Sequence, residues 1–231
     1  MTPEQMSQVH TALDETSTLA YEQLTALHDR VSRLPRDQWA RAMGEQAPET
    51  LRSWRSVGVD IMAGSLDAAT ALGVSVAAMD RGALLTTPRV VALTSWVASK
   101  APSPTAAMLK LAGIGQKLVL EGPRSYTYAL SEERGTTARR YAQPGACEWC
   151  QYLAVQEHRY EHYGSEWVQT NEADRFHEHC RCVLIPASEY IEPDYIADWD
   201  RKVDRVRDEV GGYGKNTWRD HLAAMRRLNK T

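Results

Sequence analysis

The chain has 231 residues, of which 43% are hydrophobic and 25% charged, and it carries a formal net charge of −3. This is the composition of a soluble protein of one or two domains, and the small negative charge argues against nucleic-acid binding over the whole surface while allowing a local basic patch. The chain opens without a basic and apolar leader and no apolar run approaches about 18 residues, so we expect no signal peptide, no membrane span and folding in a reducing cytosol.

Residues 1–122 are predicted to form a helical region. Apolar residues recur at every third or fourth position from Met6 to Leu34, which is the pattern of one long amphipathic helix that ends before Pro35. Such a stripe is typical of a core-facing helix in a bundle and also of a helix that pairs with a partner in a coiled coil.

The rest of this region contains several residues that interrupt helices. We expect a short helix that closes near Gly44 and a new helix that starts around Pro48, because proline suits the first helical turn. Residues 57–79 are mostly small and apolar but contain three glycines, so they predict two packed helices or one interrupted helix. A proline-rich loop over residues 101–105 precedes a further helix that runs into a loop within residues 106–122.

Residues 123–190 are predicted to form a small β-containing domain. Alternation that includes Tyr and Thr over residues 124–130 favours a first strand. Residues 136–145 favour a second strand that ends in a Pro-Gly turn, and residues 183–185 favour a third strand that stops at Pro186. The predicted fold class is therefore α+β and mainly α, with an elongated helical region, this small β unit and a helical tail.

Residues 191–231 are predicted to form that helical C-terminal tail. Two apolar stripes, separated by a glycine-rich break at residues 211–214, indicate two helices. From residue 215 onward, five basic residues against one acidic residue give a net charge of +4, which makes the end between Lys215 and Lys230 basic and amphipathic. A solvated charged face and a contact for an acidic protein or DNA are both compatible with this pattern.

All four cysteines lie in two short clusters. The layout is C-x2-C at Cys147 and Cys150, then 26 residues, then H-x2-C-x-C at His177, Cys180 and Cys182. Two ligands close in sequence grip a metal ion from a tight turn, and a distant pair completes a tetrahedron, which is the pattern of a zinc site. The fourth ligand beside Cys147, Cys150 and Cys180 is either His177 or Cys182, because Cys182 faces the same way as Cys180 in an extended strand.

Two properties of this motif favour a structural role over a catalytic one. A catalytic zinc keeps a coordination position open for water, whereas four protein ligands leave none. The C-x2-C also comes first, which is the reverse of the order in zinc nucleoside deaminases. We therefore expect a structural zinc, no enzymatic activity, and a loop over residues 151–176 that the metal closes. The alternatives for the cysteines are two disulfides, 147–180 with 150–182 or the crossed pair, and free buried thiols.

The segments RRYAQPGACEWCQYLA and FHEHCRCVLIP resemble the phage Mu F-like minor head proteins, over about residues 136–187. Their shared pattern matches Cys147, Cys150, His177, Cys180 and Cys182. The resemblance implies a minor capsid protein of a tailed phage, made in the host cytoplasm and incorporated into the virion, in the capsid interior or at the portal vertex, in several copies. It also implies the portal protein and other capsid proteins as partners, a role in head morphogenesis, and contact with DNA in some cases.

Two other functions compete with this interpretation. A capsid maturation protease would need a serine, a histidine and an acid that converge, and Ser125, Ser165 and Ser188 lie in or near the β unit, although no G-x-S-x-G motif is present. A zinc-knuckle nucleic-acid-binding protein would need a basic knuckle. Residues 151–176 instead carry two arginines against five acidic residues, and this net charge of −3 opposes contact with phosphates.

Overall fold

The structure is a computed structural model that describes residues 1–66, 87–160, 180–211 and 218–228. Its elements in chain order are α1 (Pro3–Val31), α2 (Arg36–Ser65), α5 (Thr87–Lys100), α6 (Pro104–Glu133), β1 (Ala138–Tyr141), α7 (Glu148–Tyr160), β2 (Val183–Pro186), η4 (Ala187–Glu189), α8 (Tyr195–Val210) and α9 (Trp218–Leu228). Helices dominate and one two-stranded sheet accompanies them, so the predicted mainly α, α+β fold class is confirmed. Within the described residues, no helix combines the length and apolar character needed to cross a membrane.

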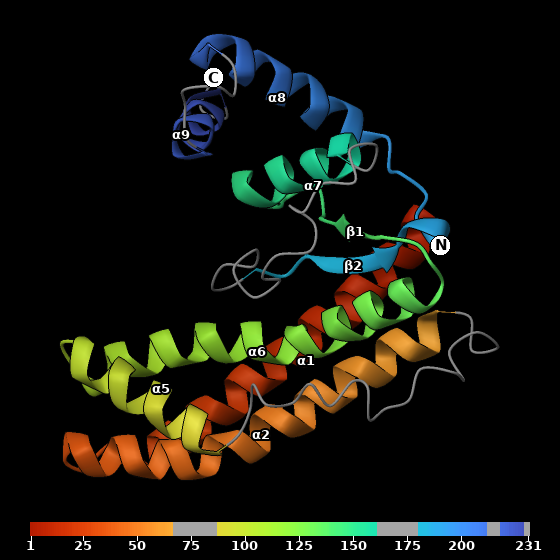
Figure 1. Ribbon diagram of the computed structural model, residues 1–231. Coiled ribbons are helices and arrows are strands. Elements are labelled where there is room, and N and C mark those ends of the chain that lie inside the picture. The colour runs from red at the N-terminus through yellow and green to blue at the C-terminus, as the bar shows by residue number, and fades with distance from the viewer. Residues whose placement is uncertain (67–86, 161–179, 212–217, 229–231) are drawn as a thin grey trace.

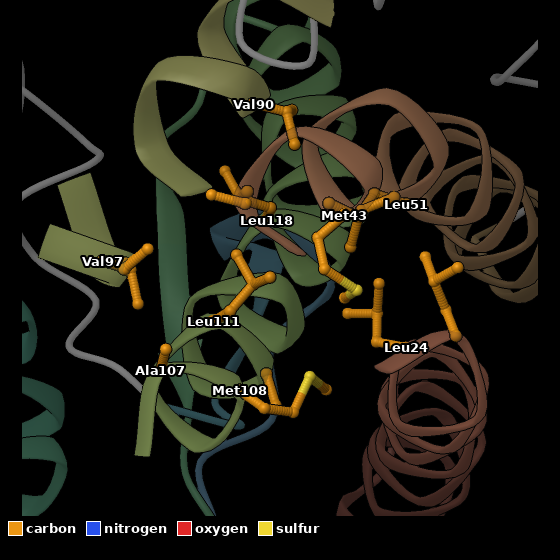
Figure 2. Close-up of a cluster of buried hydrophobic side chains, with 14 of the residues drawn as sticks. Leu24, Met43, Leu51, Val90, Val97, Ala107, Met108, Leu111 and Leu118 are labelled. Atoms are coloured by element: carbon orange, nitrogen blue, oxygen red, sulfur yellow. The ribbon is translucent and has the colours of Figure 1, made fainter. Parts of the chain in front are cut away.

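The body of the protein consists of α1, α2, α5 and α6, which pack side by side (Figure 1). Its core is a cluster of apolar side chains from all four helices, and they point toward one another in Figure 2. The labelled members are Leu24, Met43, Leu51, Val90, Val97, Ala107, Met108, Leu111 and Leu118. The apolar stripe of the N-terminal helix therefore faces a bundle core within the chain, and α1 ends before Pro35 as predicted.

The predicted break between Gly44 and Pro48 is wrong, because α2 runs from Arg36 to Ser65 with Pro48 inside it. An interior proline costs a helix about 3 kcal/mol. The same helix buries Trp39, Met43 and Leu51 completely, and each such side chain contributes roughly 1.5–3 kcal/mol. Burial of this continuous face thus outweighs the lost hydrogen bond. Of the predicted helical segment 57–79, residues up to Ser65 are helical and residues 67–79 lie outside the described part.

The strand predicted over residues 124–130 is also wrong, because these residues form the last turns of α6. Tyr126 and Leu130 are fully buried and four residues apart, a spacing that places side chains on one face of either a strand or a helix. Gly135, with φ at 62°, ends the helix, and its N–H donates to the carbonyl of Glu132. The domain boundary expected between residues 122 and 123 falls inside α6.

The two other predicted strands are confirmed as β1 and β2, which pair antiparallel with Tyr141 opposite Val183 and Arg140 opposite Leu184. Tyr141, Val183 and Ile185 pack against α1 and α6, whereas Leu184 belongs to a second core formed with α7, α8 and α9. Side chains alternate between the two faces of a strand. The sheet therefore lies between the helical body and a smaller helical layer (Figure 1).

The two helices predicted in the C-terminal tail are present as α8 and α9. Gly211, with φ at 79°, caps α8 and donates its N–H to carbonyls of the last turn. Val203 and Val206 of α8 and Leu222 and Met225 of α9 are buried in the second core. The tail helices thus cover α7, which carries the first cysteine pair.

Candidate metal centre

The first cysteine pair lies at the start of α7. A turn formed by the hydrogen bond from Ala146 N–H to the carbonyl of Gln143 (2.8 Å) leads into the helix, and the carbonyl of Cys147 accepts from the N–H of Gln151 (3.0 Å). Cys147 and Cys150 are therefore one helical turn apart and lie on the same side of α7. The interval 151–176, predicted as a loop, is helical up to Tyr160, and its remainder lies outside the described residues.

The second cysteine pair lies just before β2. Cys180 and Cys182 are 2% and 3% exposed, and with Leu184 they follow the two-residue alternation of an extended chain. Pairing of β2 with β1 and packing of α7 against β1 bring this segment to α7. As a result, the sulfur atoms of Cys150, Cys180 and Cys182 lie within 4.8 Å of one another, and those of Cys150 and Cys180 are 3.5 Å apart.

The structure thus gathers three of the five predicted metal ligands in one buried cluster. Cys147 is exposed, and its thiol lies close enough to Cys150 to hydrogen-bond with it. His177 lies outside the described residues. All four cysteines are free thiols, so neither of the two alternative disulfide pairings is formed.

The distances between the sulfur atoms fit a tetrahedral metal ion. Zn–S bonds of about 2.3 Å place sulfur ligands roughly 3.8 Å from one another. The three thiols all lie within 4.8 Å of one another, and those of Cys150 and Cys180 are 3.5 Å apart. A disulfide would require a separation of about 2.05 Å. Soft thiolate ligands in this geometry suit zinc, so the three buried cysteines can supply three of its ligands.

Two buried arginines border the cluster, and sequence reasoning did not identify them. Arg124 of α6 donates from Nη2 to the carbonyls of Cys180 and Cys182, both at 2.8 Å, and from Nε to the carbonyl of Cys182 at 3.1 Å. Arg140 of β1 lies opposite Leu184, on the face of the sheet toward α7, with Nη1 3.9 Å from the sulfur of Cys180. The available signal for Arg124 is a charged residue within an apolar stretch, but the alternation over residues 124–130 predicts a strand.

The pKa values of the clustered thiols are shifted in different directions. The pKa of Cys180 lies far below the ordinary value because of hydrogen bonds with Cys150 and Cys182, and the two buried guanidinium groups lower it further. The pKa of Cys150 is raised by hydrogen bonds with neighbouring thiols, Cys147 first, and by burial. The site therefore favours a thiolate at Cys180, which is the form that binds metal ions.

The fold and the site define a mainly helical protein with a small sheet and a buried cluster of thiols. Comparison with protein families shows that the chain belongs to the VG15 protein family, whose family model matches residues 1–205 and so includes the whole cluster. This is a family of viral proteins, so the viral class implied by the resemblance to phage head proteins is confirmed. Neither the curated proteins nor the solved structures contain a match to the chain.

Proposed function

We propose that the protein is a structural component of a tailed-phage virion, a minor capsid protein that acts at the portal vertex during head morphogenesis and contains a structural zinc centre. Membership of the VG15 family supports the viral role. The resemblance to Mu F-like proteins over residues 136–187 supports the specific role in the head. The observation that carries the zinc centre is the convergence of Cys150, Cys180 and Cys182.

Burial of the cluster supports a structural zinc. The three thiols are at most 3% exposed and belong to the same apolar cluster as Val155 and Leu184. A catalytic zinc keeps one position accessible to water and substrate, whereas here only Cys147 lies at the surface. Zinc bound by these thiols would supply a crosslink between α7 and the segment that leads into β2, and its binding free energy would stabilise the small unit.

Exposed apolar side chains support a role in assembly. Trp96 on α5 and Leu109 on α6 are 47% and 56% exposed, and Lys110 lies over the Trp96 ring at 4.8 Å. Aromatic residues of this kind are enriched at protein interfaces. We assign the portal protein and other capsid proteins as partners, and the basic C-terminal end, where Arg226 and Arg227 are exposed, as the surface available to DNA.

The experiment is co-expression of the chain with the portal and major capsid proteins of the same phage, followed by affinity purification and zinc analysis. We expect recovery of the portal protein and about one zinc per chain. Cleavage of the major capsid protein in the same mixture would instead identify the protease alternative, and a salt-sensitive DNA complex without portal protein would identify the nucleic-acid-binding alternative.

A further inference from the structure

We propose that the cysteine cluster is a site of thiol–disulfide exchange, in which a small soluble disulfide reacts at Cys147 and the oxidation ends as a buried disulfide between Cys150 and Cys180. This disulfide would join α7 to the segment before β2, the same two parts of the chain that a zinc ion would join. The chemistry requires only the reduced cysteines, so it is independent of zinc, whereas its consequence for a virion rests on the proposed function.

Cys147 is the thiol at which the oxidant reacts. All four cysteines lie in the described part of the chain, and Cys147 is exposed, whereas Cys150, Cys180 and Cys182 are at most 3% exposed. In thiol–disulfide exchange, the attacking sulfur must approach a disulfide sulfur directly. A soluble molecule such as glutathione disulfide therefore reaches Cys147 before it reaches the three buried thiols.

Cys150 lies between the exposed thiol and the buried Cys180. It is three residues after Cys147, across the first turn of α7, and these two thiols are close enough to hydrogen-bond. Its sulfur is also 3.5 Å from the sulfur of Cys180, and both of these residues belong to the second core. The three sulfur atoms thus form a continuous path from the surface into the interior.

The exchange proceeds in three steps that conserve electrons. The Cys147 thiolate attacks one sulfur of the soluble disulfide, which forms a mixed disulfide and releases one small thiolate. The Cys150 thiolate then attacks the sulfur of Cys147 and releases the second small thiolate. Finally, the Cys180 thiolate attacks the sulfur of Cys150, so that the bond between Cys147 and Cys150 breaks and Cys147 leaves as a thiolate.

The net reaction oxidises two cysteines and reduces one soluble disulfide to two small thiols. The two electrons come from Cys150 and Cys180, and in the metal-free chain the two protons come from the same thiols. Where zinc is bound, the ion leaves as two of its thiolate ligands are oxidised, and the small thiolates take their protons from water.

The disulfide between Cys150 and Cys180 is the stable product. Its formation needs the sulfur atoms to approach by about 1.5 Å, from 3.5 Å to a bonded distance of about 2.05 Å, which is a shift of the size that side-chain rotation supplies. These cysteines are 30 residues apart, whereas Cys147 and Cys150 are three apart, and a disulfide that closes a longer loop stabilises the folded chain more. Both cysteines are also buried, which protects the disulfide from small thiols.

The consequence concerns the two environments that a virion meets. Thiols stay reduced in a cytosol, whereas disulfides persist outside the cell. Zinc in the host cell and the disulfide in the released particle would each hold α7 against the segment before β2, so this crosslink would persist in both environments.

The test is oxidation of the full chain with glutathione disulfide, both metal-free and zinc-loaded, followed by alkylation of the remaining thiols and peptide mass spectrometry. Trypsin cleaves between the cysteines of the second pair, after Arg181, and a glutamyl endopeptidase cleaves between those of the first pair, after Glu148. We expect a peptide pair that joins Cys150 to Cys180, with the other two cysteines alkylated. The zinc-loaded chain should form the same disulfide and release its zinc to a chromophoric chelator.

Single variants of the metal-free chain should stop the exchange at successive steps. Cys150→Ser should end as a mixed disulfide with glutathione at Cys147, and Cys180→Ser should end as a disulfide between Cys147 and Cys150. Cys147→Ser should be oxidised at least about 10-fold more slowly than the wild type, because the thiols that remain are buried. Ala146→Ser, which keeps all four cysteines, is the matched control and should be oxidised like the wild type.

The outcomes separate this inference from the zinc centre. A wild-type chain that stops at the glutathione adduct of Cys147, or that joins another pair of cysteines, would overturn the inference and leave a zinc centre intact. A zinc-loaded chain that resists oxidation would overturn the replacement of zinc by the disulfide. A chain that forms the disulfide between Cys150 and Cys180 but binds no zinc would overturn the zinc centre alone.

A time course on the wild type keeps the inference testable if a serine variant does not fold. Samples quenched with acid should contain first the glutathione adduct of Cys147, then the disulfide between Cys147 and Cys150, and last the disulfide between Cys150 and Cys180. Formation of the last disulfide without the adduct would overturn the entry of the oxidant at Cys147.

Discussion

Asp14 on α1 forms an ion pair with Arg181, the residue between the two buried cysteines of the second cluster. The hydroxyl of Thr127 on α6 also donates to the carbonyl of Leu184 at 3.1 Å. Together with Arg124, these contacts attach the cysteine-bearing strand to two helices of the body. Zinc bound at the proposed centre would therefore stabilise a segment that the body already holds on one side and that α7 meets on the other.

Replacing Cys150 with Ser should release zinc and loosen the layer formed by α7, α8 and α9. Cys150 is 3% exposed, so the buried hydroxyl adds a cost of about 1–3 kcal/mol to the loss of the ligand. Hydrogen exchange should rise in α7 to α9, while α1 and α2 stay protected because their core does not include the cluster. Ala146→Ser, one residue before Cys147, is the control, and equal exchange in both variants would contradict a structural zinc.

Replacing Trp39 with Phe should destabilise the contact between α1 and α2. The indole Nε1 of Trp39 donates to Nδ1 of His28 at 2.9 Å in a buried position. Phe removes the donor and leaves the imidazole nitrogen buried without it, which costs about 1–3 kcal/mol.

Urea denaturation with an unchanged m-value measures this difference. Trp54→Phe is the matched control, because Trp54 donates to Gln23 at an exposed site where water can replace the bond. We expect less than about 0.5 kcal/mol there. A similar loss in both variants would show that the effect comes from the indole volume rather than from the His28 hydrogen bond.

Lowering the pH should destabilise the protein through His10. This residue is 7% exposed and packs edge-on against Tyr141 with ring centroids 6.1 Å apart. Burial lowers the pKa of His10 below its ordinary value of 6.5, and the charge of Asp14 offsets part of that shift. Below about pH 6.5 the unfolded chain binds a proton at His10 that the folded chain does not bind. The contribution of His10 to the free energy of unfolding is therefore complete above about pH 6.5 and decreases as the pH falls below it.

His10→Gln should remove this part of the pH dependence, which denaturation at a series of pH values between neutral and mildly acidic would measure. Parallel curves for the wild type and the variant over that range would show that other groups cause the acid sensitivity.

Replacing Trp96 or Leu109 with Ser should weaken binding to the portal protein without affecting the fold. Both side chains are about half exposed, so the change in unfolding free energy should stay within about 0.5 kcal/mol, whereas a central aromatic contact in an interface contributes about 2 kcal/mol or more. Recovery of portal protein with the purified variants measures the effect. Leu19→Ser, at an exposed position of α1, serves as the comparison. Undiminished recovery would place the interface elsewhere.

The sequence predicts the elements whose signals are local. The stripe of α1, the glycine that ends α8 and the spacing of Cys147 and Cys150 each depend on neighbours within a few residues. The structure has α1, the end of α8 at Gly211, and Cys147 and Cys150 one helical turn apart at the start of α7. The strand predicted over residues 124–130 is wrong because the spacing of its buried side chains also fits a helix. The predicted break near Pro48 is wrong because packing against helices distant in sequence stabilises α2. No local sequence pattern shows this packing.

The least predictable part of the site is Arg124, because its function depends on a contact with residues 56 and 58 positions away. Sequence spacing shows that cysteines can share a metal ion. It does not show which buried cations surround them, since those come from α6 and β1 through tertiary packing.

Replacement of glycine by alanine should change the free energy of unfolding in opposite directions at two positions of the body. At Gly122 on α6, an added Cβ would lie 2.5 Å from Cγ and 3.0 Å from the carbonyl oxygen of Arg55, so Gly122→Ala must push α6 away from α2. Overpacking of this kind costs about 1–3 kcal/mol. At Gly64 on α2, no atom lies within 4 Å of an added Cβ, and Gly64→Ala should stabilise the helix by up to about 1 kcal/mol. Urea denaturation of both variants tests the pair, and stabilisation by Gly122→Ala would show that α2 and α6 are not in close contact at Arg55.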